Sequence, residues 1–282
     1  ADSEVAVTSN QSILRSILSR LDGAGHYQTA SEDRISLAHK VIYGFGAFVN
    51  NLLAAAIGGM VIILNLGLGM NPALVGLLGA LPRLTDAITD PLMGYISDNT
   101  SSRWGRRRPY IFVGAIFAGI VFMILWQLPV GMSESFYFWY FLIGSFVFYL
   151  GYTIFATPWV ALGYELTPDY HERTRLMGVQ NFMGQFAYII SPWFLAIMQA
   201  SMFTDMVEGA SYLAIAIGIL TIGIGILPAI LLRERFSHPE LESEQVMVRE
   251  KKESMWAVIS RNMVEFFKGF VTTLKVKPFL ML

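Results

Sequence analysis

The chain of 282 residues is 54% hydrophobic and only 15% charged, with a formal net charge of -1 at pH 7. Soluble domains usually carry about 25% charged residues, so this composition argues against a water-soluble fold and favours a membrane protein. A nearly neutral chain offers no basic surface for nucleic acid. A chain without cysteine has no disulfide, thiolate metal site or cysteine nucleophile.

Long apolar runs dominate the chain. A bilayer core about 30 Å thick is crossed by roughly 20 apolar residues in a helix. Runs of this kind occupy residues 41–66, 73–96, 109–129, 136–162, 177–203 and 211–232. We therefore expect an all-α membrane protein with a six-helix bundle over residues 39–232.

The basic residues predict how this bundle is oriented. Lys and Arg in short loops stay on the cytoplasmic side of a membrane. They precede the first run and fill the loops after the second, fourth and sixth runs, whereas the three alternate loops contain none. Both termini are therefore expected to be cytoplasmic, and the expected location is the cell inner (plasma) membrane.

Three segments lie outside the predicted bundle. Residues 1–38 form a polar tail, in which Ile13–Leu21 is either a membrane-surface helix or part of a solvated tail. Residues 233–275 form a cytoplasmic middle loop that contains an amphipathic helix. Residues 276–282 resemble the start of a seventh span, which leads us to expect a truncated chain.

The second apolar run contains ionisable residues. Each one costs at least about 2.5 to 3.5 kcal/mol near the bilayer centre, so such residues are functional candidates. Arg83, Asp86 and Asp90 are spaced three and four apart, which places them on one face of a helix. Small residues beside them favour close approach of a neighbouring helix. We expect the charged face to point into the bundle.

Two carboxylates and one guanidinium leave this face with one surplus negative charge. Oxygen ligands suit a hard cation such as Na⁺, and two neighbouring acids also favour the binding of a proton. Either ion would make the cluster neutral. The alternative is an ion-paired cluster that only packs helices or braces a gate.

Three stretches resemble the glycoside-pentoside-hexuronide:cation symporters, the melibiose-permease-like branch of the major facilitator superfamily. They are Lys40–Phe48, Arg83–Gly94 and Ser97–Pro109, and the similarity extends over residues 38 to about 232. The resemblance implies a twelve-helix transporter that holds its solute between two six-helix bundles and alternates access. This chain would supply the N-terminal bundle and would lack the C-terminal half, its partner in the transporter.

The resemblance also implies a cation site. Its ligands would be the acids Asp86 and Asp90, which would hold a metal ion if the cation is Na⁺, together with Thr89 and Thr153. No cofactor is expected besides Na⁺ or H⁺ as the coupling ion.

The solute site implied by the resemblance is altered in this sequence. Asn51, Ala156 and Asn181 occupy positions where melibiose permease has Asp, Asp and Arg. Tyr152 matches, and Trp159 lies one residue before the family's stacking position. An amide accepts sugar hydroxyls more weakly than a carboxylate, which argues against a galactoside. Another glycoside, a uronide or a non-sugar solute stays open, with four expected substrate-binding residues, Asn51, Tyr152, Trp159 and Asn181.

An inner gate is the third implied feature. In the resemblance Asp98 and the arginines after the second span pair with charged groups of neighbouring helices, although such arginines also set topology in any membrane protein. Glu172 and Arg173 are the partners that we expect. The predicted gating residues are Arg83, Asp98, Arg103, Arg106, Arg107, Glu172 and Arg173.

The leading hypothesis is symport of a glycoside or related sugar with Na⁺ or H⁺. A facilitator or a carrier of lipid-like solutes with the same fold is the alternative. An intramembrane aspartyl protease is disfavoured because Asp86 and Asp90 lie one turn apart on one helix, whereas a catalytic dyad needs converging carboxyls. A membrane scaffold would leave the buried charges without a purpose. We therefore expect a transporter and not an enzyme.

Overall fold

A computed structural model of the protein describes residues 29–100 and 102–234, and all regular structure in these residues is helical. The stretch Ile13–Leu21, the amphipathic helix predicted within 233–275 and the segment 276–282 lie outside the described residues. These three expectations therefore stay predictions.

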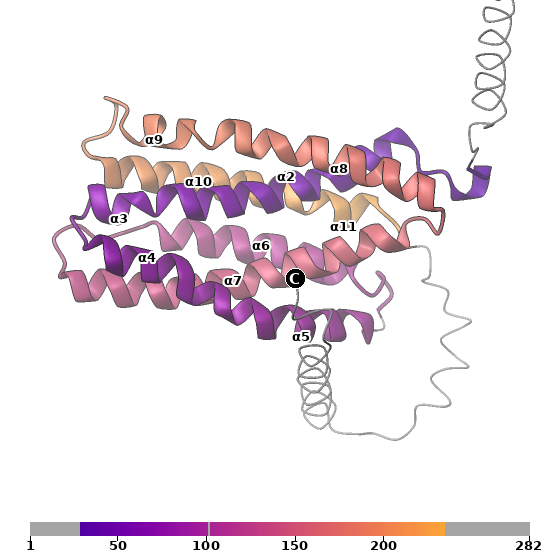
Figure 1. Ribbon diagram of the computed structural model, residues 1–282, viewed down its shortest axis with the longest axis horizontal. Coiled ribbons are helices and arrows are strands. Elements are labelled where there is room, and N and C mark those ends of the chain that lie inside the picture. Colours follow the sequence, from indigo (N-terminus) through magenta and orange to yellow (C-terminus); the bar gives the residue numbers. More distant parts are fainter. Residues whose placement is uncertain (1–28, 101, 235–282) are drawn as a thin grey trace, which may run out of the picture.

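The helices run back and forth along one elongated bundle, with α8 and α9 at one edge and α4 and α5 at the other (Figure 1). In chain order they are η1 (Ser31–Asp33), α2 (Leu37–Met60), α3 (Ile62–Leu66), α4 (Pro72–Ala80), η2 (Leu81–Thr85), α5 (Asp86–Asp98), α6 (Arg108–Leu125), α7 (Glu134–Glu165), α8 (Tyr170–Ile190), α9 (Trp193–Met198), α10 (Met206–Gly225) and α11 (Leu227–Leu231).

Within residues 29–100 and 102–234, four helical stretches are long and apolar enough to cross a membrane. They are Ser31–Leu66, Arg108–Leu125, Glu134–Glu165 and Met206–Leu231. These stretches coincide with the first, third, fourth and sixth predicted spans, and they indicate a multi-pass membrane protein.

The second and fifth predicted spans are divided into shorter helices. The second consists of α4, η2 and α5, with Pro82 in the first turn of η2 and Pro91 inside α5. The fifth is divided between α8 and α9 next to Pro192. Proline has no backbone N–H to donate, so it interrupts the hydrogen-bond pattern of a helix. The charges of the second run also lower its hydropathy.

Side chains fix where several helices begin. Each of these N-cap side chains accepts a hydrogen bond from a backbone N–H of the first turn, a group that has no partner within the helix. The capping residues are Ser36, Asn71, Ser133, Asp169 and Asp205.

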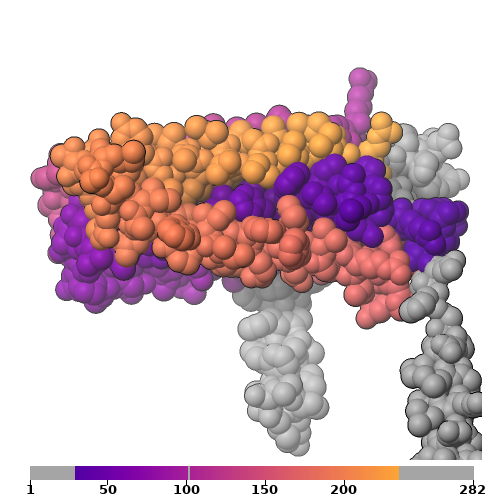
Figure 2. Space-filling view, turned by 90° about the horizontal axis from the view of Figure 1, so that it is seen from above, coloured from indigo at the N-terminus to yellow at the C-terminus, as the bar shows by residue number. Residues whose placement is uncertain are grey.

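Helix α2 lies inside the bundle, between α8 on one side and α10 with α11 on the other (Figure 2). The closest approaches occur at glycines. A Cβ atom on Gly114 of α6 would come within 2.4 Å of the backbone nitrogen of Phe155 in α7. A Cβ on Gly46 of α2 would come within 2.1 Å of Trp159 Nε1. These glycines let α6 and α2 pack directly against α7.

One end of the bundle collects the basic residues. Here α2, α6 and α8 begin, and α5 and α7 end. We call it the arginine end, because it contains the arginines of the loop between α5 and α6. The acid cluster predicted from the sequence lies away from this end, at the junction of η2 and α5.

Candidate cation and solute site

A tight helical turn sets the position of the acidic residues. Segment η2 ends at Thr85, and Asp86 is the first residue of α5. Thr85 Oγ1 donates to the carbonyl of Pro82 at 2.6 Å, and Thr89 Oγ1 donates to the carbonyl of Thr85 at 3.1 Å. These two hydroxyls therefore give hydrogen bonds to carbonyl groups at the junction where the 3₁₀ segment η2 ends and the α-helix α5 begins. Asp86 is the first residue after this junction.

Helix α7 provides the hydrogen bonds of the second acid. Thr153 Oγ1 donates to Asp90 Oδ1 at 2.9 Å, and Thr157 Oγ1 donates to the same oxygen at 3.3 Å. Thr89 Oγ1 lies 3.4 Å from Thr153 Oγ1. The structure thus brings together Asp90, Thr89 and Thr153. Thr157 was not among the predicted ligands, although its spacing of four from Thr153 places both hydroxyls on one face of α7.

The first acid lacks such partners. Asp86 Oδ1 is buried and has no hydrogen-bond partner. Among the described residues, no ion pair joins Asp86 or Asp90 to a basic side chain. Leaving a buried acceptor unsatisfied costs about 1–3 kcal/mol, and more if it is charged. A cation or a proton bound at this oxygen would remove that cost.

Asp86 and Asp90 are the only two acids of this cluster. The described residues contain no group of three or more His, Asp or Glu side chains that could hold a metal ion. A metal at Asp86 and Asp90 would therefore depend on hydroxyl and carbonyl oxygens for its other contacts. Thr89 and Thr153 offer such oxygens next to Asp90. Hard monovalent and divalent cations accept such mixed oxygen ligands.

A cavity of about 220 Å³ opens beside Asp86. Arg83 lies in its wall, where Nε donates to Tyr149 Oη at 3.4 Å, and Tyr152 Oη in the same wall donates to Asn50 Oδ1 at 2.8 Å. The cavity is lined by Ala54, Ile57, Arg83, Asp86, Phe148, Tyr149 and Tyr152. One of the four predicted solute residues, Tyr152, therefore lines the same cavity as Asp86.

The other predicted solute residues lie elsewhere. Asn51 accepts a hydrogen bond from Asn50 Nδ2 at 3.3 Å, and Asn50 in turn accepts the hydrogen bond of Tyr152. Asn181 is exposed on α8 and does not line the cavity.

Trp159 lies in the core, so the structure does not present it to a ligand as the sequence prediction requires. It is 2% exposed, stacks on Tyr43 with ring centroids 5.1 Å apart, and donates from Nε1 to the Tyr43 carbonyl at 3.2 Å. The aromatic groups beside the acids are Phe148 and Tyr149 instead. Both lie about one helical turn before Tyr152, and this spacing in the sequence could have indicated that they share a face of α7 with it.

The arginine end contains a first ionic cluster around the loop between α5 and α6. Arg107 contacts Asp98 at 2.5 Å and Glu165 at 3.0 Å, and Arg106 contacts Glu165 at 2.6 Å. The carboxylate of Glu234 accepts backbone N–H groups of residues 106–108. The sequence prediction identified Asp98, Arg106 and Arg107 but missed Glu165 and Glu234.

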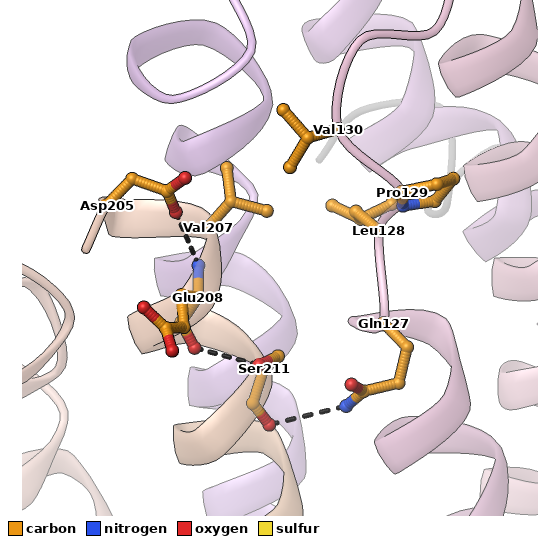
Figure 3. Close-up of a pocket in the computed structure, with 8 residues that line it drawn as sticks. All are labelled: Gln127, Leu128, Pro129, Val130, Asp205, Val207, Glu208 and Ser211. Carbon is orange, nitrogen blue, oxygen red and sulfur yellow. Dashed lines mark hydrogen bonds between the residues drawn. The ribbon is translucent and has the colours of Figure 1, made fainter. Parts of the chain in front are cut away.

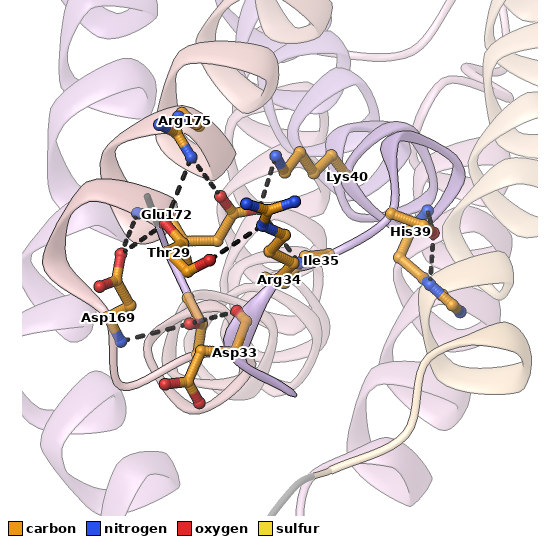
Figure 4. Close-up of polar contacts among 11 residues, drawn as sticks. Thr29, Asp33, Arg34, Ile35, His39, Lys40, Asp169, Glu172 and Arg175 are labelled. Carbon is orange, nitrogen blue, oxygen red and sulfur yellow. Dashed lines mark hydrogen bonds and ion pairs between the residues drawn. The ribbon is translucent and has the colours of Figure 1, made fainter. Parts of the chain in front are cut away.

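A second ionic cluster surrounds Glu172 (Figure 4) and shares no ion pair with the first. Glu172 contacts Lys40 at 2.6 Å and Arg175 at 2.9 Å, and it accepts the backbone N–H of Ile35 at 3.0 Å. Burial by itself would raise the pKa of Glu172, but these hydrogen bonds outweigh burial and hold the pKa below its usual value.

The predicted partnership of Glu172 and Arg173 with the arginine loop is therefore corrected. Arg173 donates to the Thr167 carbonyl at 3.1 Å and lies over the ring of Tyr164. Glu172 instead pairs with Lys40 and Arg175 and accepts the backbone N–H of Ile35. Arg103 is exposed, and Arg83 lies in the cavity wall rather than at the arginine end.

A larger cavity of about 350 Å³ lies at the opposite end, between the end of α6 and the start of α10 (Figure 3). Its polar groups make local bonds: Asp205 accepts the N–H of Glu208 at 2.7 Å, and Gln127 donates to the Ser211 carbonyl at 3.4 Å. These contacts cap α10 and join it to α6, so they have a structural role.

A helical membrane bundle with an unpaired acid beside an aromatic-lined cavity is typical of a membrane transporter. Residues 42–264 match the family described as MFS/sugar transport protein, and the chain belongs to that family. This is a family of transporters and not of enzymes. The chain's relatives include named symporters, which confirms the resemblance to the glycoside-pentoside-hexuronide:cation symporters.

Three relatives illustrate the range of the family. The chain is 29% identical to "Uncharacterized symporter sll1374" of Synechocystis sp. over 76% of this chain and 40% of the relative. It is 30% identical to "Sodium-dependent lysophosphatidylcholine symporter 1" of Gallus gallus over 51% of this chain and 27% of the relative. It is also 30% identical to "Isoprimeverose transporter" of Lactiplantibacillus pentosus over 41% of this chain and 24% of the relative. The chain thus spans less than half of each.

Proposed function

We propose that the complete protein performs cation-coupled secondary transport, with Na⁺ or H⁺ bound at Asp86 and Asp90. The observation that carries this proposal is the buried Oδ1 of Asp86, which has no hydrogen-bond partner while Asp90 is held by α7. A bound cation discharges the pair, which lowers the cost of enclosing it when the solute site closes. Solute transport is coupled to cation binding because the charged site without a cation opposes that closure.

The proposed topology places the arginine end in the cytoplasm. Lys40, Arg106 and Arg107 lie at this end, whereas the sequence between α3 and α4, between α6 and α7 and between α9 and α10 contains no Lys or Arg. The positive-inside rule then orients the bundle, with six spans over residues 39–232 and both termini cytoplasmic. The proposed location is the inner (plasma) membrane, where this bundle would face a second one.

The proposed solute is a glycoside or a related sugar. Tyr149 and Tyr152 offer aromatic faces and hydroxyls to a sugar, and Arg83 offers N–H donors to its oxygens. The relative named as an isoprimeverose transporter supports this class.

A lipid-like solute, carried with or without a cation, is the second candidate. The observation that favours it is the apolar part of the same wall, formed by Ala54, Ile57 and Phe148. The relative named as a lysophosphatidylcholine symporter gives it further support.

Uptake by the complete protein in proteoliposomes tests both parts of the proposal. A panel of radiolabelled glycosides, uronides and lysophospholipids would be offered under an inward Na⁺ gradient, an inward H⁺ gradient, or neither. We expect one solute class to accumulate under one gradient. Uptake that reaches only equilibrium under every gradient would identify a facilitator instead.

Substitution of the acids tests the site itself. Asp86→Asn and Asp90→Asn should each abolish accumulation against a gradient. Asp205→Asn is the matched control: it removes one negative charge at the other end of the bundle and keeps a capping side chain for α10. Full accumulation by both site variants would overturn the assignment.

A further inference from the structure

A third cavity lies at the arginine end and shares no residue with the site described above. Its volume is about 280 Å³, and it is formed where α2 begins and α7 and α11 end. Its wall consists of Arg34, Ile35, His39, Leu166, Leu231, Leu232 and Arg233. Its lining touches the second ionic cluster only at Ile35, whose backbone N–H binds Glu172, and the proposed transport cycle does not use this cavity.

The polar part of the wall is basic. Arg34, His39 and Arg233 contribute the basic groups, and none of the lining residues is acidic. Two acids adjoin these arginines in the sequence, Asp33 and Glu234; neither lines the cavity, and Glu234 is bound by the backbone N–H groups of residues 106–108. The residues that line this cavity therefore contribute positive charge and no negative charge.

Local hydrogen bonds hold two of the basic side chains in place. Arg34 donates from Nε to the Thr29 carbonyl at 2.9 Å, a bond that does not use its two Nη atoms. His39 Nδ1 lies 2.7 Å from Ser36 Oγ, and the ring is directed away from the Glu172 cluster (Figure 4). The start of α2, a helix of 24 residues, adds the partial positive charge of a helix N-terminus.

The other part of the wall is apolar and continues onto the surface. Leu231, which lines the cavity, is 47% exposed, and its neighbour Ile230 is 44% exposed. Leu37, at the first position of α2, is 69% exposed. Basic groups next to exposed aliphatic side chains, at the end of a membrane bundle, match a ligand with an anionic head and apolar chains.

We propose that this cavity binds a phosphate group, presented by an anionic phospholipid or by free phosphate. Arg34 and Arg233 contact the phosphate oxygens, and His39 donates a further hydrogen bond. For a phospholipid, the acyl chains lie along Leu231 and the exposed aliphatic side chains beside it. The ligand would tie the start of α2 to the end of α11, two elements that already pack together.

Three ligand titrations of the purified full chain in detergent test this proposal, with the melting temperature as the readout. The ligands are phosphatidylglycerol, phosphatidylcholine with the same acyl chains, and inorganic phosphate. We expect a saturable rise with phosphatidylglycerol and none with phosphatidylcholine. A rise with inorganic phosphate as well would identify the free anion as a sufficient ligand. Equal rises with both lipids, or no rise with any ligand, would overturn the proposal.

Variants then assign the response to the cavity. Arg34→Gln and Arg233→Gln should each weaken the apparent affinity for phosphatidylglycerol about five- to tenfold, because each removes one charge from the phosphate. Arg233→Lys keeps the charge and should retain most of the affinity. Arg103→Gln removes the same charge from an exposed position outside the cavity and should leave the affinity unchanged. Equal losses in Arg103→Gln and Arg233→Gln would show a nonspecific charge effect and overturn the proposal.

Discussion

Two carboxylates of this protein, Asp86 and Glu172, are in opposite situations. Glu172 is 2% exposed, yet two basic side chains and a backbone N–H surround it. Asp86 also has a buried oxygen, but that oxygen has no partner and no basic side chain pairs with the residue. A buried acid with every partner present stabilises a fold, whereas a buried acid without partners is ready to bind an ion. The same residue class thus indicates a structural role at one position and a functional role at the other.

The largest effect on stability is expected at the paired acid. Glu172→Ala should lower the free energy of unfolding by about 3–5 kcal/mol, because the largely buried Lys40 would lose its partner. Thermal unfolding of the purified protein in detergent measures this loss. Arg175→Gln removes a partner that is 52% exposed and should cost less than about 1 kcal/mol. Equal losses from the two variants would mean that Glu172 is not held by a buried pair.

The matching substitution at the unpaired acid should act in the opposite direction. Asp86→Asn removes a charge that forms no ion pair among the described residues, so the melting temperature without Na⁺ should stay the same or rise. Any rise in melting temperature that Na⁺ produces in the wild type should disappear in the variant. A loss of stability like that of Glu172→Ala would make Asp86 a structural residue and erase the contrast.

The next effect concerns the packing that supports the acid site. Gly114→Ala should destabilise the protein by about 1–3 kcal/mol, because the new Cβ would lie 2.4 Å from backbone atoms of α7. Gly76→Ala in α4 is the control, since a Cβ there meets nothing within 4 Å and alanine favours a helix by up to about 1 kcal/mol. Unfolding of both variants in one detergent gives the comparison. If Gly114→Ala were as stable as Gly76→Ala, the close contact of α6 with α7 would be wrong.

The grouping of side chains at the candidate site could be predicted where helical spacing and the resemblance carry the information, while their role as cation ligands stays a prediction. Asp86, Asp90 and Thr89 share one short segment, and Thr153 follows from the resemblance. Asp90, Thr89 and Thr153 indeed lie together. Trp159 could not be placed this way, because its burial depends on a glycine of another helix, Gly46.

The long-range partners at the arginine end, Glu165 and Glu234, were beyond sequence reasoning. These carboxylates contact groups that the converging helix ends bring within reach, and spacing along the chain does not reveal that convergence. Glu165 and Arg107 are far apart in sequence, yet their side chains meet at 3.0 Å. The fold followed the apolar runs more closely, and it departed from them where proline and charge divide the second and fifth runs.

A smaller effect should separate the two threonines of α7. Thr153→Val removes a 2.9 Å hydrogen bond to Asp90 and a hydroxyl next to Thr89, so half-saturation of transport should need about tenfold more cation. Thr157→Val removes only the 3.3 Å bond and should change half-saturation less. The measurement is initial uptake against cation concentration. A larger effect from Thr157→Val would show that Thr157, and not Thr153, is the threonine of α7 that contacts the cation.

The smallest effect is the pH dependence that Glu172 contributes. Its pKa is lowered in the folded protein from an unfolded value near 4.5, so the folded state binds fewer protons than the unfolded state. The stabilisation is therefore complete above about pH 4.5 and is lost as the pH falls through the lower folded pKa. Melting temperatures of the wild type and Glu172→Gln should differ most near neutral pH and converge as the solution is acidified. Because both proteins share every other carboxylate, the difference isolates Glu172, and a constant difference across this range would contradict the lowered pKa.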